Sequence, residues 1–310
     1  MEVPRSIFHK QQKYGFDIFL KIKDTYHLFA AQGALLQDIH LDMLKTKGTK
    51  VYVRKSDWGL VEYSLRHKED SCFLDTNMDF QEKANIIYDS AIQSIKDVYK
   101  GVLPKTLADV ERNANDLVKL ILSDGHVIES LKLINTADHF TYQHSVRVGI
   151  YATGLTLKLF GKRLSSKETT KLSTGFFLHD VGMADVPMYI LEKNTKLSSS
   201  EWDIVREHPI KGRDRMVKTG ALNYEAISII LYHHERHDGS GYPYNLVGED
   251  IPAYAKICAM ADTFESLTAH RPYRDALSPY DAIHVMFQEM AKEFDPVLFA
   301  SFVKLLGPEK

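Results

Sequence analysis

Apolar residues recur three and four positions apart over most of the chain after residue 105, which is the spacing of helices with one buried face. A serine or threonine followed three residues later by an acidic residue is typical of a capping box at a helix start. This pattern occurs at Thr106 with Asp109, Ser165 with Glu168, Ser198 with Glu201, and Ser278 with Asp281. Alternating strand patterns are scarce here, so the sequence predicts an all-α domain.

The first hundred residues have a different pattern. Residues 17–22, 26–30 and 50–55 read as short strands, while residues 35–45 have helical spacing. The sequence therefore predicts a small α+β module at the N-terminal end.

A long helical pattern over residues 79–99 joins this module to the rest, and Gly101 and Pro104 break it. We therefore expect an α+β domain over residues 1–100 and an all-α domain over residues 101–310. The first domain is locally basic, which favours a solvated face over the alternative, a docking or regulatory surface. The basic residues are Lys45, Lys47, Lys50, Arg54, Lys55, Arg66 and Lys68.

Two polar residues interrupt an apolar stripe of the second domain. Leu172, Phe176, His179, Asp180 and Met183 recur at helical spacing, which predicts that His179 and Asp180 lie on the buried face of one helix. An ionised carboxylate in a core without a partner costs several kcal/mol. A compensating group is therefore expected beside Asp180.

Four further predicted helices show the same anomaly, because each directs a histidine or an aspartate along an otherwise apolar row. Together the five helices supply His144, His179, Asp180, His208, His233, His234 and Asp262. A single histidine on an apolar face is more often a core residue bonded to a backbone carbonyl. That interpretation is kept for His27, His40, His126 and His284.

Seven such residues in one half of the chain favour a metal site. Imidazole and carboxylate groups without a thiolate suit iron, manganese or zinc. Seven ligands are too many for one ordinary ion, so the pattern indicates two ions that share a bridging carboxylate.

The segment after the tandem histidines is rich in glycine and reads Asp-Gly-Ser-Gly-Tyr-Pro over residues 238–243. Its position beside candidate ligands favours a substrate-facing loop over a plain turn. Arg271 and Arg274 follow Asp262 closely, and guanidinium groups match phosphate oxygens. An anionic, phosphate-bearing substrate is one interpretation of this pair, and surface salt bridges are the other.

Composition excludes several other classes of protein. The 310 residues carry a net charge of −2, so nothing indicates binding of polymeric nucleic acid. Cys72 and Cys258 stand in no disulfide or metal spacing, which fits a reducing compartment. No apolar run approaches the roughly 20 residues of a membrane span, and residues 1–5 lack a secretory pattern. We expect a cytoplasmic protein without membrane insertion.

The motifs in this order resemble the HD-GYP family, a branch of the HD metal-dependent phosphohydrolases. The match runs from about Asp138 to Pro296. It includes His144 to Val148, His179 to Gly182, Glu207 to Pro209, His233 to Arg236, Asp238 to Pro243, Ala261 with Asp262, and Arg271 to Arg274. The resemblance implies an HD-type helical domain over residues 101–310.

The resemblance also implies an activity, the hydrolysis of the bacterial messenger cyclic di-GMP to linear pGpG, to GMP or to both. It implies that the seven residues named above bind two divalent ions, iron or alternatively manganese. Asp180 would bridge the two ions, which would activate a bridging hydroxide for attack on phosphorus. Tyr242, Gly241, Arg271 and Arg274 match positions that contact the substrate.

Two departures from the family pattern matter. Met183 stands where the family usually has a lysine close to the scissile phosphate, and methionine offers neither charge nor donor. Phe140 stands where members with three metals have a carboxylate, so two metals are expected, with Asp138 as an outer-shell partner.

These departures leave three functional interpretations. The favoured one is an active phosphodiesterase. The second is a weakly active or inactive metal-bound module that senses cyclic di-GMP or docks other signalling proteins. The third is hydrolysis of another phosphoester.

Overall fold

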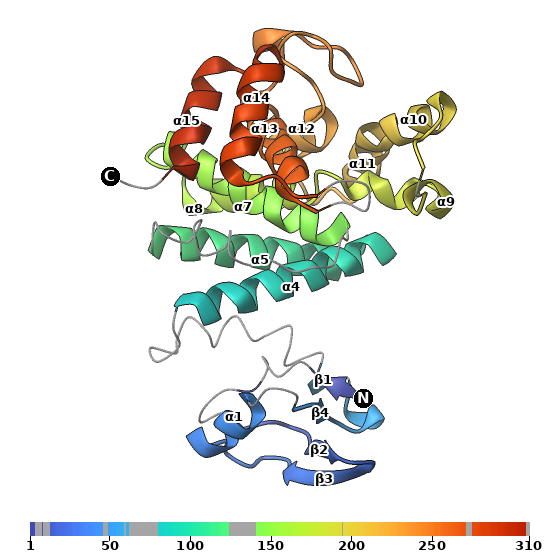
Figure 1. Ribbon diagram of the computed structural model, residues 1–310, viewed down its shortest axis with the longest axis vertical. Coiled ribbons are helices and arrows are strands. Elements are labelled where there is room, and N and C mark those ends of the chain that lie inside the picture. Colours follow the sequence, from blue (N-terminus) through green and yellow to red (C-terminus); the bar gives the residue numbers. More distant parts are fainter. Residues whose placement is uncertain are drawn as a thin grey trace. The chain divides into compact units, whose positions relative to one another are not determined.

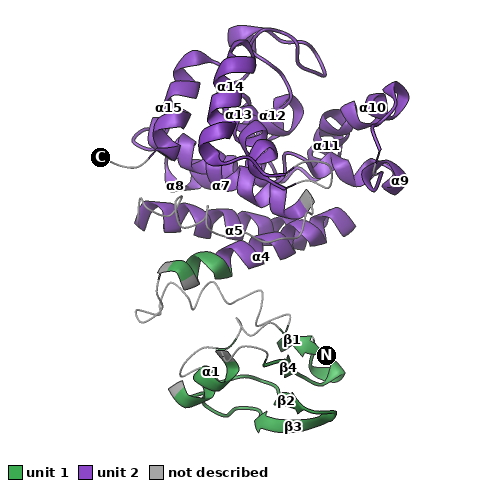
Figure 2. Cartoon of the chain, in the orientation of Figure 1, with its two compact units in different colours: residues 1–86 green, residues 87–310 purple. Residues whose placement is uncertain are grey.

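The computed structural model describes residues 1–3, 8, 13–45, 49–58, 60–61, 80–123, 141–193, 195–270 and 275–307. The chain forms two compact units, residues 1–86 and residues 87–310 (Figure 2). Helix α4 (Phe80–Lys100) begins in the first unit and ends in the second. A functional division at residue 100 stays a prediction.

The first unit contains a small antiparallel sheet and a short helix. Its elements are β1 (Glu2–Val3), β2 (Ile18–Ile22), β3 (Thr25–Ala30), α1 (Asp38–Lys45), β4 (Val51–Tyr52) and the 3-10 turn η2 (Lys55–Asp57). The strand order is β1-β4-β2-β3 (Figure 1). Phe16, Ile18, Leu36, Leu44 and Val51 lie in its core. The α+β prediction for this region is confirmed.

Two of the basic residues in this unit have acidic partners. Lys50 Nζ lies 3.1 Å from Glu2 Oε2, and Arg54 Nη2 lies 2.9 Å from Asp17 Oδ2. Because these charges are locally balanced, the pairs favour a solvated face at these two positions.

The second unit is built from helices in its described residues. After α4 come α5 (Pro104–Ser123), α7 (Thr141–Phe160), α8 (Ser166–Phe177), η3 (Val181–Asp185), α9 (Met188–Leu191), α10 (Ser199–Arg206), α11 (His208–Val217), α12 (Tyr224–Tyr232), η4 (Gly248–Asp250), α13 (Ala253–Thr268), α14 (Pro279–Glu289), η5 (Ala291–Glu293) and α15 (Pro296–Leu306). Helix α8 packs against α5, α7 and α12, and α13 packs against α7, α12 and α14 (Figure 1). The prediction of an all-α second domain is confirmed for this part of the chain.

Helices α7, α8, α12, α13 and α15 enclose the main core of this unit. Leu155, Phe176, Ile229, Phe264 and Phe302 are among its buried side chains. Throughout the described ranges, every helix falls short of the length or apolar character that crossing a membrane requires.

The predicted caps locate most helix starts correctly. Ser165 and Ser198 form complete capping boxes, and Ser278 accepts a hydrogen bond from the third residue of α14. The cap predicted at Thr106 was wrong, because α5 begins at Pro104 and the Thr106 hydroxyl accepts from Leu103 N before the helix. Proline is favoured at a helix start, which explains the earlier beginning.

Helix α8 approaches α12 closely at a glycine. A Cβ at Gly175 would lie 2.8 Å from Ala226 Cα and 3.0 Å from Ala226 Cβ. Both contacts are closer than carbon atoms normally pack, so the absence of a side chain at Gly175 sets the distance between the two helices.

We expect Gly175→Ala to lower the free energy of unfolding by about 1–3 kcal/mol, because the added methyl group forces α8 away from α12. Urea unfolding measures the change. Gly101→Ala is the matched control, since a Cβ there meets no atom within 4 Å and its effect should be near zero. Equal stability of both variants would contradict close packing at Gly175.

Candidate metal centre

The seven side chains predicted to bind metal come from segments that are distant in the chain. Two lie within helices, His144 in α7 and Asp262 in α13. The other five lie at helix boundaries: His179 and Asp180 after α8, His208 at the start of α11, and His233 and His234 after α12.

The prediction that His179 and Asp180 continue one helix face was wrong. Helix α8 ends at Phe177, and the chain turns before η3 begins at Val181. Adjacent side chains on a regular helix diverge by about 100°, so they do not point at one centre. Ending the helix allows both residues to do so, and the same holds for the tandem histidines after α12.

Three histidines are fixed by the ends of helices. The Nδ1 atoms of His179, His208 and His233 donate to the carbonyl oxygens of Phe176, Val205 and Ile230 at 2.9, 2.8 and 2.9 Å. Each acceptor lies in the last turn of a helix, where carbonyls lack an amide partner four residues on. These bonds place the proton on Nδ1, so the unprotonated Nε2 atoms are the ones that could bind a metal ion.

The two carboxylate oxygens of Asp180 face different histidines. Oδ1 lies 3.1 Å from His208 Nε2 and 3.6 Å from His233 Nε2. Oδ2 lies 3.6 Å from the Nε2 atoms of both His144 and His179. Asp180 therefore stands between two sets of imidazoles.

Asp262 is shared in a similar way. Its Oδ1 lies 3.2 Å from His144 Nε2, and its Oδ2 lies 3.8 Å from His234 Nδ1. The seven side chains fall into two groups. Within each group, the atoms that could bind a metal ion all lie within 4.8 Å of one another. One group is Asp180, His208, His233 and His234, and the other is His144, His179 and Asp262.

Buried Glu265, which pairs with Arg147, orients His144. Its Nδ1 donates to Glu265 Oε2, and Arg147 Nη1 donates to Glu265 Oε1 at 3.3 Å. The Glu265 side chain is only 2% exposed. The sequence pattern assigned no role to Glu265, although it lies three residues after Asp262 and hence on the same face of α13.

The turn after α8 is held from two sides. The Tyr99 hydroxyl donates to the carbonyl oxygen of Asp180 at 2.7 Å. A Cβ at Gly182 would lie 1.9 Å from the carbonyl oxygen of His208. Glycine is therefore required at this position for η3 to pack against the start of α11.

The protonation states suit the binding of cations. Burial raises the pKa of the Asp180 and Asp262 carboxyls, but the neighbouring imidazoles outweigh it and hold both pKa values below the ordinary range. Burial lowers the pKa of His179 to about 4, which keeps its imidazole neutral. Burial opposes the charge on His144, but Glu265 and Asp262 raise its pKa to about 10, and a cation at Nε2 would take the place of that proton.

These residues fit divalent metal ions. The fully buried Nε2 of His179 has no hydrogen-bond partner in the described part of the chain, which leaves a costly unsatisfied lone pair. Imidazole nitrogens and carboxylate oxygens are the donors that iron, manganese and zinc accept. Filling both groups would satisfy this nitrogen and balance the buried carboxylates.

The glycine-rich loop packs tightly beside the centre. Glu235 is buried and accepts from Tyr244 N at 2.7 Å and from Leu246 N at 2.9 Å. A Cβ at Gly241 would lie 2.4 Å from Arg236 N, so only glycine fits. The loop thereby brings Tyr242 onto His234, with ring centroids 4.6 Å apart.

Tyr242 is a hydrogen-bond donor at neutral pH. Burial, and then the charges of Asp180 and Asp262, raise the pKa of its hydroxyl. The hydroxyl therefore stays protonated beside the centre.

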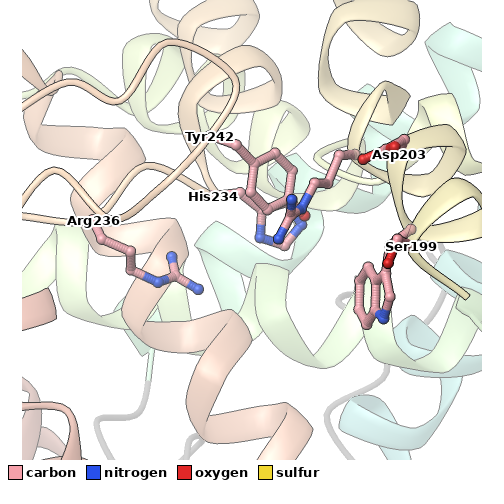
Figure 3. Close-up of a pocket in the computed structure, with 7 residues that line it drawn as sticks. Ser199, Asp203, His234, Arg236 and Tyr242 are labelled. Carbon is pink, nitrogen blue, oxygen red and sulfur yellow. The ribbon is translucent and has the colours of Figure 1, made fainter. Parts of the chain in front are cut away.

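A pocket of about 460 Å³ opens beside His234 and Tyr242 (Figure 3). Its other lining residues are Ser199, Trp202, Asp203, Arg206 and Arg236. None of these five was predicted as a site residue. The predicted site residues Asp138, Arg271 and Arg274 lie outside the described residues.

Comparison with known proteins places a family-model match within the second unit. The family model described as "HD domain" matches residues 130–298. A cyclic di-GMP phosphodiesterase of Pseudomonas aeruginosa is 34% identical over 199 residues, which cover 63% of this chain and 47% of that protein.

A second relative is the cyclic di-GMP phosphodiesterase response regulator RpfG of Xanthomonas campestris, 37% identical over 153 residues. This match covers 47% of this chain and 38% of RpfG. The chain thus spans less than half the length of these curated relatives.

A solved structure resembles the whole chain. A protein of Bdellovibrio bacteriovorus described as an HDG"Y"P protein superposes with a TM-score of 0.73 and 21% identity. The match covers 99% of both chains. At this identity, the likeness shows the fold alone.

We expect Asp180→Asn to remove metal from both groups, because its two oxygens face the two sets of imidazoles and the amide lacks their charge. Metal analysis of anaerobically purified protein measures the loss. Asp185→Asn is the matched control, since Asp185 is exposed and pairs with Arg215. An Asp180→Asn variant with the wild-type metal content would contradict the shared role.

Proposed function

Because the chain belongs to the HD domain family, and within it to the HD-GYP group that its motifs resemble, we propose that it is a phosphodiesterase that hydrolyses cyclic di-GMP. The products would be linear pGpG, GMP or both. The names of the two curated relatives support this substrate. The HD domain implies binding of divalent metal ions.

One observation supports this function, namely that the seven candidate ligand side chains fall into two groups around the two oxygens of Asp180. We propose that the group with His208, His233 and His234 holds one ion, and that His144, His179 and Asp262 hold the other. Asp180 would bridge them. The ions would be iron, with manganese as the alternative.

Bound divalent ions supply Lewis acidity, which neutralises phosphoryl oxygens and lowers the pKa of a water toward neutrality. The residues of this chain supply the setting. Asp180 and Asp262 provide negative charge, and the helix-end carbonyls hold the imidazoles in one orientation. Little reorganisation is then needed when charge develops on phosphate.

We propose that the loop beside His234 contacts the substrate. The protonated Tyr242 hydroxyl would donate to a phosphate oxygen, and Gly241 keeps the loop close to the tandem histidines. Arg271 and Arg274 would add positive charge, and Asp138 would support a ligand from outside the centre. We also propose that residues 1–100 form a regulatory or docking domain in the cytoplasm.

Met183 supports a second candidate function, that of a weakly active or inactive sensor of cyclic di-GMP or a partner-docking module. Met183 lies within η3, three residues after Asp180, where the family usually has lysine. A missing cation there would weaken stabilisation of the transition state without removing the metal ligands.

We expect protein loaded with iron or manganese under reducing conditions to convert cyclic di-GMP to linear pGpG or GMP. Chromatography of the nucleotides measures this conversion. Chelation of the metal should abolish turnover, because the carboxylates and imidazoles alone supply no Lewis acid. Binding of cyclic di-GMP without turnover would favour the sensor. Turnover of a different phosphoester, with neither binding nor hydrolysis of cyclic di-GMP, would overturn both the phosphodiesterase and the sensor proposals.

We expect Met183→Lys to raise kcat about tenfold or more, because a cation near the phosphate stabilises charge that develops in the transition state. Steady-state kinetics with cyclic di-GMP measure the change. Met188→Lys is the matched control, since Met188 is exposed on α9 and should leave kcat unchanged. An unchanged kcat in Met183→Lys would show that methionine at this position does not limit catalysis.

A further inference from the structure

We propose that one face of helix α10 binds the guanine nucleotide of the substrate, with Trp202 stacking on the base, Asp203 recognising the guanine edge and Arg206 binding a phosphate. This assignment rests on the hydrolysis of cyclic di-GMP proposed above, and it adds the residues that select guanine.

The residues of α10 that line the pocket form a helical stripe. Ser199 lies three and four residues before Trp202 and Asp203, and Arg206 lies three and four residues after Asp203 and Trp202, so the four side chains span about 100° around the helix. In most helices such a stripe is apolar and buried. Here no residue of α10 is fully buried, and Trp202 is 47% exposed. This stripe faces a cavity instead of a core.

The pocket adjoins the metal centre. It is also lined by His234, one of the predicted ligands, and by Tyr242, which stacks on His234. Figure 3 shows Ser199 and Asp203 on one side of the Tyr242–His234 stack and Arg236 on the other. A volume of about 460 Å³ lies in the range of small-molecule sites. A nucleotide seated here would have its phosphate near the ligand groups.

Of the two arginines that line the pocket, Arg236 pairs with a carboxylate and Arg206, in the part of the chain that the structure describes, does not. Arg236 Nε lies 3.2 Å from Glu293 Oε2, and its Nη1 donates to the carbonyl oxygens of His233 and Glu235. Arg206 has no ion-pair partner among the described residues, and its guanidinium lies 5.8 Å from the centre of the Tyr242 ring. Arg206 therefore keeps an unneutralised fork for phosphate oxygens.

Asp203, on the same stripe, carries a carboxylate that would repel a phosphate. The part of the ligand beside Asp203 should therefore donate hydrogen bonds. Guanine presents two parallel donors, N1–H and the N2 amino group, which match the two oxygens of a carboxylate. Adenine presents an acceptor at its N1 and would be rejected. Trp202, the residue before Asp203, supplies a flat apolar surface on which a base stacks.

Helix α10 is held firmly enough to act as a binding wall. Ser198 and Glu201 form its capping box, and Lys193 Nζ lies 2.8 and 2.6 Å from the two oxygens of Glu201. These contacts lie at the N-terminal end and leave the pocket stripe free. Ordering this face in advance lowers the entropic cost of binding.

The test compares Trp202→Ala, Asp203→Asn and Arg206→Ala in the manganese-loaded full chain. Steady-state kinetics with cyclic di-GMP, cyclic di-AMP and 3′3′-cGAMP are combined with calorimetric binding of GMP and with metal analysis. Trp202→Ala and Arg206→Ala should each raise KM for cyclic di-GMP about tenfold, with the metal content unchanged. Arg206→Lys should recover part of the loss, because it restores charge without the fork.

Asp203→Asn gives the sharpest result. An amide offers one donor and one acceptor and therefore matches adenine, so the preference for cyclic di-GMP over cyclic di-AMP should fall about tenfold or more. A purely structural role of Asp203 would lower both activities equally.

Lys218→Ala and Tyr189→Ala are the matched controls, because both side chains are exposed and absent from the pocket. If the wild type turns over cyclic di-GMP and the three pocket variants keep its KM and its preference, the role of α10 is overturned alone. If the wild type neither binds nor hydrolyses cyclic di-GMP, the proposed function fails as well.

Discussion

The architecture of the second unit depends on hydrogen bonds between imidazoles and the last carbonyls of three helices. The final turns of α8, α10 and α12 carry carbonyl oxygens without helical partners, at the negative end of the helix dipole. Histidines 179, 208 and 233 each donate Nδ1–H to one of these oxygens, three residues back. This bond satisfies the helix end and directs Nε2 into the centre. The three helices must therefore end at the same place, which requires the close packing of η3 on α11 at Gly182.

Buried negative charge is the second constraint. Asp180, Asp262 and Glu265 all lie in the interior of the helical unit, and Arg147 pairs with Glu265. Carboxylates removed from water are costly unless cations lie close to them. The surrounding imidazoles offer places where cations could bind, and metal binding at these positions would be coupled to folding. Glu265 contributes by fixing His144, not by facing the shared centre itself.

The segments proposed to contact the substrate, the loop with Tyr242 and helix α10, are held by hydrogen bonds of other kinds. Buried Glu235 ties the loop that carries Tyr242 through two backbone amides, and the capping box at Ser198 ties α10. The side chains that line the pocket on these segments remain partly exposed. The residues that would hold cations are thus mostly buried, while the residues of α10 that would select the nucleotide are exposed.

The sequence by itself determined the residue types and much of the helical pattern. Two capping boxes, at Ser165 and Ser198, and the cap at Ser278 lie where their local spacing predicts, because such contacts join residues three apart. The seven candidate ligands stand out since charged groups are rare on apolar faces. Periodicity does not reveal where a helix stops, so the turns at His179 and His233 were missed. Only the tertiary structure decided how the two oxygens of Asp180 divide the histidines. It also decided that Glu265 meets His144 across 121 residues of chain, because such contacts depend on how whole helices pack.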